Sequence, residues 1–578
     1  MPLVLSAGNN LAPRRPWLRR YTHELLAAAI LLVMAGNLVS IVVRKSITAD
    51  EVVLIPSAYY HFVADEVHLI GQHPPLCKLL AGLPLLFLQP NEWKPERTDP
   101  AGRSDQHEWN YVSHFWRDNA AIFEQICFWA RLPMIALTLA LGVLVLVFTR
   151  DLFGPRAAVL AVALFALEPT ILAHGRVVQT DVPAAFGLLV TLLALYRYLR
   201  APSWPAAGIL GAAVAIAVLA KFSMLVICAA LAVIVVVLLF RTQGPALLLQ
   251  HALIAAIVAL LVINAAYFFY HRPLTEGDFK WIAECFPGSA SWIYNGVRAS
   301  RLMLPTDFLI GVLWQANHAR GGHPAGLLGM YRVHGWWYYF PVAFSLKATI
   351  PFLLASLGGI GWSTYRLLRF HERRLLFVLI PLVAYTALLM LSPIDIGVRY
   401  YLPGYVLLVI LSAGFLNFLL RGRSFAIKLA VVITLGWMVT EAVRAYPNYM
   451  PYMNQLASAR PHWWYLSDSN VEWGDDGKEL AAWLRSRGES RVRALLLGGF
   501  ATLDFYGVNY VDALGKAEPP PRYLALGASF LNGSTVPPYE INGKRVPEET
   551  RVNRFDSFRR RTPEAIIGGS IYVFRNSD

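Results

Sequence analysis

Long apolar segments recur along the first 443 residues of this 578-residue chain. Most of them approach the about 20 residues that a helix needs to cross a bilayer. Hydrophobic residues make up 56% of the chain and charged residues only 15%, unlike an average soluble protein. We therefore predict an all-α polytopic membrane protein with about 11 transmembrane helices, at residues 25–43, 127–149, 157–173, 182–199, 206–220, 222–240, 247–267, 341–361, 374–391, 402–420 and 425–443.

The first apolar segment follows several arginines, as a signal peptide does. Its apolar run is too long for a signal peptide, no small-residue cleavage site follows it, and further spans come after it. We predict a retained membrane anchor.

Basic residues are distributed unevenly between the two sides of the predicted spans. With the N-terminus in the cytoplasm, the short cytoplasmic segments hold sixteen, namely Arg14, Arg15, Arg19, Arg20, Arg150, Arg156, Arg197, Arg200, Arg241, Arg366, Arg369, Arg373, Arg374, Arg421, Arg423 and Lys428. The opposite short segments hold five, namely Arg44, Lys45, Arg176, Lys221 and Arg399. This distribution follows the positive-inside rule and predicts a cytoplasmic N-terminus. The net charge of +14 then reflects topology and does not indicate a nucleic-acid partner.

An odd number of spans places the C-terminal region outside the cytoplasm, together with two long loops at 44–126 and 268–340. The assignment depends on two short spans that meet at Lys221. If Lys221 were buried within one long span, every later segment would change sides.

The hydropathy changes after residue 443, which predicts a membrane domain at 1–443 and a small extracytoplasmic α/β domain at 444–578. A helix is predicted at 475–487, ending at Gly488, and strands at 492–498, 522–526 and 570–574. Helix capping and turn formation explain the polar residues before and at the start of this helix, namely Asp468, Asn470, Asp475 and Asp476.

Two adjacent carboxylates, Asp50 and Glu51, follow the first span directly. Charged groups near hydrocarbon are costly and often mark a functional site, and two acids at a helix end have no obvious stabilising purpose. The loop that follows contains the prolines of His73-Pro74-Pro75-Leu76-Cys77-Lys78, and residues 76–88 suit a helix lying in the membrane interface.

Four groups of polar residues share the predicted extracytoplasmic face and could carry chemistry. A carboxylate can accept a proton from an attacking hydroxyl, and Arg or Lys can stabilise a phosphate leaving group. The groups are Asp50 with Glu51, His73 with Lys78, the segment 168–181 with His174, Arg176 and Asp181, and the segment 395–399 with Asp395 and Arg399.

These residues also have structural alternatives. Asp181 could cap the helix that begins at Val182, His174 could be a surface loop residue, and the cations Arg176, Lys221 and Arg399 could pair with lipid headgroups. The aromatic run at 335–341 could be an interfacial belt. A disulfide between Cys77 and Cys285 is possible, and no spacing of cysteines or histidines indicates a metal site.

Several segments resemble one family. Asp50-Glu51, HPPL-K, EPTILAHGRVVQTD, GWWYYFPVAFSLK and IGVRYYLP are similar to the phospholipid-carrier-dependent glycosyltransferases of the GT-C superfamily, in the branch of the protein O-mannosyltransferases and the lipid A aminoarabinose transferases. The resemblance covers residues 1–443. The tail, with DSNVEWGDD, looks like that of bacterial members and lacks the lectin-like repeats of the eukaryotic mannosyltransferases, which puts a protein acceptor in doubt.

The resemblance implies an inverting single-displacement transfer from a polyprenyl-phosphate sugar to an acceptor lipid, glycan or protein outside the plasma (bacterial inner) membrane. We predict no cofactor other than this donor substrate, and we assign no metal, because the cationic residues could take the place of a metal at the phosphate. Asp50 matches the catalytic acid of the family, with Glu51 beside it, and Asp181 matches the second acidic position. His73, Lys78 and Arg399, with His174 and Arg176, correspond to the region of the donor phosphate.

Two other classes of protein remain. A secondary transporter or flippase could bind a polar or lipid cargo with the same charged groups, but transporters usually place such groups near mid-membrane within repeated halves. A structural scaffold of the cell envelope would leave the acid pair and the HPPL segment unexplained. The charges at the span ends favour the enzyme.

Overall fold

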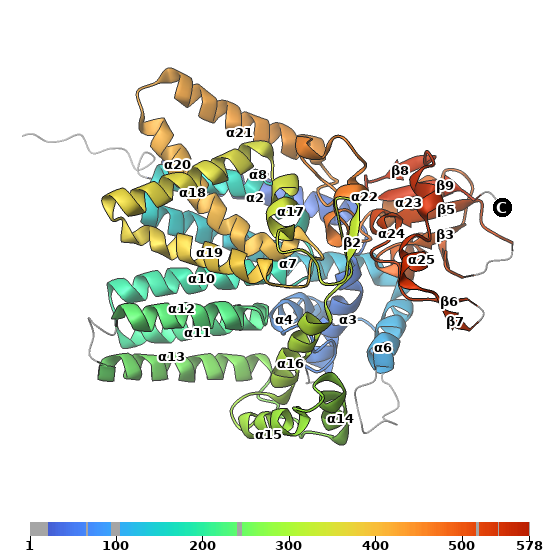
Figure 1. Ribbon diagram of the computed structural model, residues 1–578, viewed down its shortest axis with the longest axis horizontal. Coiled ribbons are helices and arrows are strands. Elements are labelled where there is room, and N and C mark those ends of the chain that lie inside the picture. The colour runs from blue at the N-terminus through green and yellow to red at the C-terminus, as the bar shows by residue number, and fades with distance from the viewer. Residues whose placement is uncertain are drawn as a thin grey trace, which may run out of the picture.

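The computed structural model describes residues 21–64, 67–93, 105–239, 245–515, 519–541 and 543–576. A bundle of helices forms the larger part of the molecule, and a smaller region of mixed helices and strands lies at one end of it (Figure 1). The basic residues Arg14, Arg15, Arg19, Arg20 and Arg241, which contributed to the predicted topology, lie outside the described residues.

Each of the eleven predicted spans contains helix, which confirms the helical membrane domain. In the described part of the chain, seven segments are long and apolar enough to cross a membrane. They correspond to α2 (Thr22–Arg44), α7 (Phe123–Phe153), α10 (Asp181–Arg200), α13 (Pro245–Ala266), α19 (Leu376–Met390), α20 (Leu402–Arg421) and α21 (Phe425–Ala445). Four more helices fill the bundle, namely α8 (Pro155–Leu167), α11 (Trp204–Ala220), α12 (Met224–Leu239) and α18 (Ile350–Phe370). The number of eleven crossings stays a prediction.

Helix α20 forms the centre of the bundle. It contacts α7, α8, α10, α18, α19 and α21, and it is buried along most of its length. The helix is apolar on all sides, as expected for a helix surrounded by others. It continues directly from the 3₁₀ turn η3 (Val398–Tyr401), so the packing of α20 also fixes the position of Arg399.

Two of the predicted spans are interrupted, and the interruptions meet. The span predicted at 157–173 divides into α8 and α9 (Pro169–His174), and the span predicted at 341–361 divides into α17 (Tyr339–Lys347) and α18. The Glu168 carboxylate accepts hydrogen bonds from the backbone N–H of Thr349 (3.3 Å) and from its hydroxyl (3.1 Å). Prolines follow each break, and a proline cannot donate a helix hydrogen bond. The breaks therefore satisfy each other's polar groups inside the bundle.

The loop at 44–126 folds into a compact helical layer with an aromatic core. Its helices are α3 (Ala49–Val63), α4 (Leu76–Gly82), α5 (Leu85–Leu88) and α6 (Asp105–Asp118). Tyr111, Phe115 and Trp116 are fully buried, and the Trp116 indole donates to the carbonyl of Val52 (2.8 Å). The predicted interfacial helix at 76–88 is present but divided at Leu83 and Pro84.

The loop at 268–340 lies at the same end of the bundle (Figure 1). It contains α14 (Glu276–Cys285), α15 (Ala290–Ser300), α16 (Thr306–Gly321) and the hairpin of β1 (Ala325–Leu327) and β2 (Met330–Arg332). The aromatic run that follows is not simply an interfacial belt. Trp337 is exposed, but Trp336, Tyr339 and Phe340 are buried, and the Tyr339 hydroxyl accepts a hydrogen bond from Asn470 (2.8 Å).

The C-terminal region is the predicted α/β domain. Its sheet has the order β4-β3-β5-β9-β8, with β3 parallel to β4 and β5 and the other pairs antiparallel. The predicted helix corresponds to α23 (Gly477–Arg485) and the three predicted strands to β3 (Arg491–Leu495), β5 (Tyr523–Gly527) and β9 (Ile571–Arg575). The remaining elements are α22 (His462–Tyr465), β4 (Asn509–Asp512), α24 (Ala528–Asn532), β6 (Glu540–Ile541), β7 (Lys544–Arg545), α25 (Glu548–Val552), α26 (Asp556–Arg559) and β8 (Ala565–Ile567).

All four cysteines are free, so the disulfide considered between Cys77 and Cys285 is not formed.

Candidate active site

Two carboxylates and two cations meet at the end of the bundle that faces the α/β domain. A guanidinium nitrogen of Arg399, Nη1, lies 2.7 Å from Asp50 Oδ2 and 3.3 Å from Asp181 Oδ2. The Lys221 ammonium forms a hydrogen bond with the other Asp181 oxygen. The structure thus brings together three predicted site residues, and it adds Lys221, which was not predicted as a site residue.

The local fold explains how these residues converge. Asp50 lies in the first turn of α3, and Asp181 is the first residue of α10. The N-terminus of a helix carries a partial positive charge that favours acidic side chains. Thr180 is the N-cap residue of α10, so the proposal that Asp181 caps this helix is wrong, since its carboxylate pairs with the cations instead. Lys221 lies between α11 and α12, where the chain leaves helical geometry.

Exposure distinguishes the two carboxylates. The side chain of Asp50 is 25% exposed, whereas that of Asp181 is 1% exposed. The two cations also differ, since the side chain of Lys221 is 18% exposed and that of Arg399 is 6% exposed. Asp50 is therefore the solvent-accessible acid of the cluster, and Asp181 is placed to hold the cations.

Aromatic rings and a hydroxyl fix the two cations. The Arg399 guanidinium carbon lies 4.2 Å from the centre of the Trp473 ring, and its Nε donates to the Ser469 hydroxyl (3.0 Å). The Lys221 ammonium lies 3.5 Å from the centre of the Tyr400 ring. Such cation–π contacts stabilise a charge that is withdrawn from water. Both cations are thus engaged within the protein, which argues against a role confined to lipid headgroups.

The two predicted histidines lie close to this cluster and to its charged groups. The pKa of His73 is lowered to about 4, chiefly by burial and also by the charges of Lys78, Lys221 and Arg399, against the opposing effect of Asp50. Burial, assisted by Arg399, lowers the pKa of His174 to about 3. His174 is 1% exposed and packs edge-on against Trp473, so the surface-loop alternative is wrong. Both imidazoles are neutral near pH 7.

Glu51 has a structural role, contrary to the prediction that both adjacent acids belong to the site. Its carboxylate is fully buried and accepts from two Arg131 nitrogens (2.8 and 2.6 Å). It also accepts from the backbone N–H groups of Thr48 and Val178 (both 3.0 Å). The first of these is half of a capping box at the start of α3. An acid at this helix end therefore does have a stabilising purpose, and its oxygens are fully occupied.

Lys78 also lies apart from the cluster of Asp50 and Arg399. Its ammonium is fully buried and donates to the carbonyls of Leu69 (3.3 Å) and Ile70 (3.1 Å), and burial lowers its pKa to about 8. Lys78 thus holds the segment that leads to His73, and a direct contact with a donor phosphate is not supported.

Arg176 joins the membrane domain to the α/β domain, whereas Asp395 holds the end of the 268–340 loop within the membrane domain. One Arg176 nitrogen, Nη2, lies 2.5 Å from Asp475 Oδ2, and both side chains are 2% exposed. The Asp395 carboxylate is buried and accepts from the backbone N–H of Trp336 (2.6 Å), and burial raises its pKa to about 7. Neither residue reaches Asp50.

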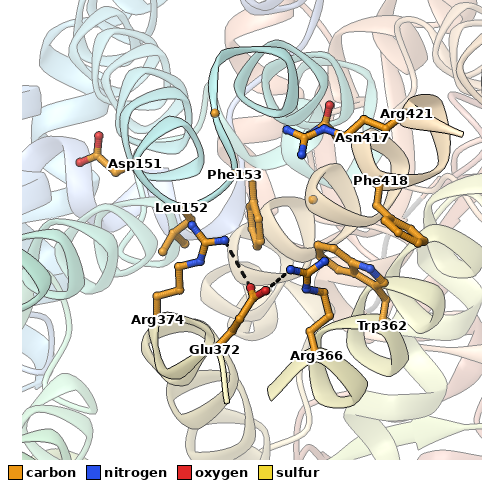
Figure 2. A pocket seen from close by; sticks show the side chains of 12 residues that line it. Asp151, Leu152, Phe153, Trp362, Arg366, Glu372, Arg374, Asn417, Phe418 and Arg421 are labelled. Carbon is orange, nitrogen blue, oxygen red and sulfur yellow. Dashed lines mark hydrogen bonds and ion pairs between the residues drawn. The ribbon is translucent and has the colours of Figure 1, made fainter. Parts of the chain in front are cut away.

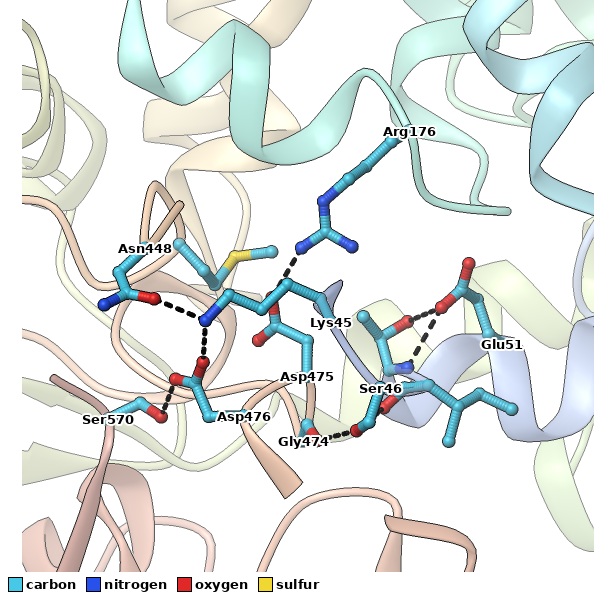
Figure 3. Close-up of polar contacts among 12 residues, drawn as sticks. Lys45, Ser46, Glu51, Arg176, Asn448, Gly474, Asp475, Asp476 and Ser570 are labelled. Carbon is cyan, nitrogen blue, oxygen red and sulfur yellow. Dashed lines mark hydrogen bonds and ion pairs between the residues drawn. The ribbon is translucent and has the colours of Figure 1, made fainter. Parts of the chain in front are cut away.

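The segment 466–476 closes the site from the C-terminal side and was misinterpreted from the sequence. Figure 3 shows Asp476 beside Lys45 and Asp475 beside Arg176, so these acids form buried ion pairs with the membrane domain. Asp476 is the N-cap residue of α23, but its side chain makes no capping hydrogen bond. The same segment supplies Ser469 and Trp473 to Arg399. The density of acidic and polar residues in DSNVEWGDD was the available signal.

Among the described residues, no group of three or more His, Cys, Asp or Glu side chains is arranged to hold a metal ion.

One family model matches part of the chain. Residues 112–268 match the model described as dolichyl-phosphate-mannose-protein mannosyltransferase. This segment runs from the middle of α6 to just past the end of α13 and includes Asp181 and Lys221 of the cluster. The match confirms, for this segment, the resemblance to the GT-C superfamily that the motifs indicate. With the apolar helices, it defines a multi-pass membrane protein of glycosyltransferase-like sequence.

Three solved structures are similar to the whole chain at low identity. ArnT from Cupriavidus metallidurans bound to undecaprenyl phosphate gives a TM-score of 0.48 at 15% identity, covering 91% of this chain and 97% of that chain. The same protein in the apo state gives a TM-score of 0.48 at 14% identity, covering 97% of this chain and 98% of that chain. The Archaeoglobus fulgidus oligosaccharyltransferase in complex with Zn and sulfate gives a TM-score of 0.46 at 12% identity, covering 87% of this chain and 68% of that chain. No curated protein matches the sequence.

Proposed function

We propose that this protein is an integral-membrane glycosyltransferase that moves a sugar from a polyprenyl-phosphate donor to an acceptor by inverting single displacement. The observation that carries the proposal is the partly exposed Asp50 carboxylate beside Arg399, in a cluster with a second cation, Lys221. The family model matched by residues 112–268 is named for a donor of this chemical class, mannose on dolichyl phosphate.

The reaction places two demands on the site. The acceptor hydroxyl must lose a proton as its oxygen attacks the anomeric carbon, and a carboxylate can take that proton. The bond from the anomeric carbon to the phosphate oxygen breaks at the same time, and the polyprenyl phosphate leaves with the electron pair. Negative charge grows on this phosphate, so nearby cations stabilise the transition state more than the bound donor.

Asp50 is the proposed base, because it is the exposed carboxylate of the cluster. Arg399 and Lys221 are the proposed phosphate ligands, and Asp181 holds both cations in place between turnovers. His73 lies near the same charges as a neutral imidazole, so it can donate a hydrogen bond to the phosphate without adding charge.

The site faces the α/β domain and the two long loops, which the charge distribution places outside the cytoplasm. The acceptor is accordingly a lipid, glycan or protein on the outer side of the bacterial inner membrane. A transporter is the alternative function. It would place its charged groups near the middle of broken helices, whereas Asp50, Asp181 and Arg399 lie at the starts of α3, α10 and η3 at one end of the bundle.

The test is the variant Asp50→Asn, with Asp512→Asn as the matched control, since Asp512 is exposed in the α/β domain. Purified protein is incubated with dolichyl phosphate-linked mannose and with other polyprenyl-phosphate sugars, in the presence of a membrane extract as the source of acceptor. The release of polyprenyl phosphate and the labelled product are measured. Loss of the base should slow release about 10²- to 10⁴-fold while the melting temperature is unchanged. Wild-type turnover in Asp50→Asn would refute the assignment of the base.

A further inference from the structure

A cavity of about 290 Å³ opens at the end of the bundle farthest from the α/β domain. It lies among the end of α7, the end of α18, the connection from α18 to α19 and the last turns of α20. Figure 2 shows Arg366 and Arg374 directed toward Glu372 on one side and Arg421 with Asn417 across the cavity. The site proposed above shares no residue with this cavity.

Several hydrogen-bond donors in the cavity lack an acceptor. Glu372 pairs with Arg366 and lies 3.3 Å from Arg374, so it neutralises one of these two charges. The Nε of Arg366 is nevertheless buried without a hydrogen-bond partner. Arg421, whose side chain is exposed, makes no ion pair or hydrogen bond with any residue that the structure describes, and the side-chain amide of the buried residue Asn417 makes none there either. Buried donors normally have a partner.

The charge balance also requires an anion. The cavity is lined by three arginines and by two acids, Glu372 and Asp151. Asp151 Oδ2 lies 3.7 Å from Nη2 of Arg197, a residue that does not line the cavity. The charge of Asp151 is therefore already paired with Arg197. An excess of positive charge remains at Arg421. Planar guanidinium groups with free donors suit the oxygens of a phosphate.

The walls of the cavity are partly aromatic. Trp362 and Phe418 lie with ring centres 5.6 Å apart, and Phe418 is 47% exposed. An apolar, exposed ring beside a basic cavity at the end of membrane helices fits the glycerol and upper acyl carbons of a lipid. Basic pockets between membrane helices bind anionic lipid headgroups.

We infer that this cavity is a binding site for a phosphate group, with Arg421, Arg366 and Asn417 as its donors. An anionic phospholipid of the adjacent leaflet and a soluble phosphate share this chemistry. The aromatic wall favours the lipid. The inference is independent of glycosyl transfer, because the cavity lies at the opposite end of the bundle from Asp50.

The test compares two lipids that differ only in the phosphate, dioleoylphosphatidic acid and dioleoylglycerol. Full-length protein in a mild detergent is titrated with each, and bound lipid is measured by native mass spectrometry. The variant is Arg421→Gln. The matched control is Arg423→Gln, which removes the same charge two residues away from an exposed arginine that does not line the cavity. Inorganic phosphate is titrated separately as a competitor to identify the source of the ligand.

Phosphatidic acid should bind the wild type and Arg423→Gln more tightly than dioleoylglycerol does, and Arg421→Gln should weaken it on the order of 10-fold. Asn417→Leu, a second variant that changes no charge, should weaken it as well. Displacement by inorganic phosphate at equal concentration would support the phosphate site with a soluble ligand. Equal weakening by Arg421→Gln and Arg423→Gln, or equal binding of both lipids, would overturn the inference.

Discussion

Asp475→Asn should loosen the attachment of the α/β domain to the membrane domain. Arg176 and Asp475 form an ion pair in which both side chains are 2% exposed. The other two Arg176 nitrogens, Nε and Nη1, are buried without a hydrogen-bond partner, as is the second oxygen of Asp475. Loss of the Asp475 charge therefore leaves the guanidinium buried with no counter-charge at hydrogen-bond distance among the described residues.

The magnitude follows from this burial. Removal of one partner of a buried ion pair costs about 3–5 kcal/mol, whereas replacement of both by apolar residues is often neutral. The unfolding entropy is about 2.1 cal/mol/K per residue. If the whole chain unfolds together, the melting temperature falls by about 2.5–4 °C. If residues 444–578 unfold alone, it falls by about 11–18 °C.

The assay is thermal unfolding in detergent for Asp475→Asn, Arg176→Met and the double variant Arg176→Met/Asp475→Leu. Each single variant should melt earlier, and the double variant should recover more than half of the loss. The control is Asp556→Asn, in a surface pair with Arg560 in which the arginine is 82% exposed, which should cost no more than about 1 kcal/mol. Unchanged melting of both single variants, or a double variant that shows the sum of their losses, would refute this account.

Three further predictions follow from the same geometry. Glu51→Gln should lower the melting temperature, because it breaks the buried ion pair with Arg131. The activity per folded molecule should persist. A loss of turnover in folded protein would show that Glu51 takes part in the reaction. The pKa of His174 is about 3, against 6.5 ordinarily, so the unfolded state binds more protons and stability is lost as pH falls from about 6.5 toward 3. His174→Gln should flatten this decline in melting temperature, and an unaltered decline would contradict the cause. With Cys285 replaced, an impermeant thiol reagent on intact cells should label a cysteine at exposed Ser486 and miss one at exposed Ser424; the reverse pattern would invert the topology.

Hydropathy predicted most of the fold, because burial in a bilayer selects long apolar runs. It missed the breaks at Glu168 and Thr349, since a window over apolar residues does not register a polar pair whose partners are 181 residues apart. Three strands of the α/β domain, β3, β5 and β9, were predicted from the sequence, and α23 from its helical spacing, whereas β4 and β8 were not predicted. The order of the strands depends on contacts between distant segments, which periodicity does not encode.

The sequence located the cluster better than it assigned individual roles. Charges at the ends of apolar spans led to Asp50, Asp181 and Arg399, which the structure brings together. The same argument selected Glu51 as well, because adjacent residues share a hydropathy environment. Their side chains, however, leave a helix about 100° apart, so one faces the cluster and the other faces Arg131. Residue spacing alone did not show which face was buried.

The C-terminal region contributes residues to the proposed site. Ser469 and Trp473 contact Arg399, and neighbouring acids bind Lys45 and Arg176. Two buried ion pairs on one short segment are costly unless their partners are positioned well, so the segment can occupy only one register against the bundle. That constraint is what fixes the guanidinium of Arg399 at 2.7 Å from Asp50. The geometry of the proposed site therefore depends on the docking of the α/β domain as much as on the helices that carry the charges.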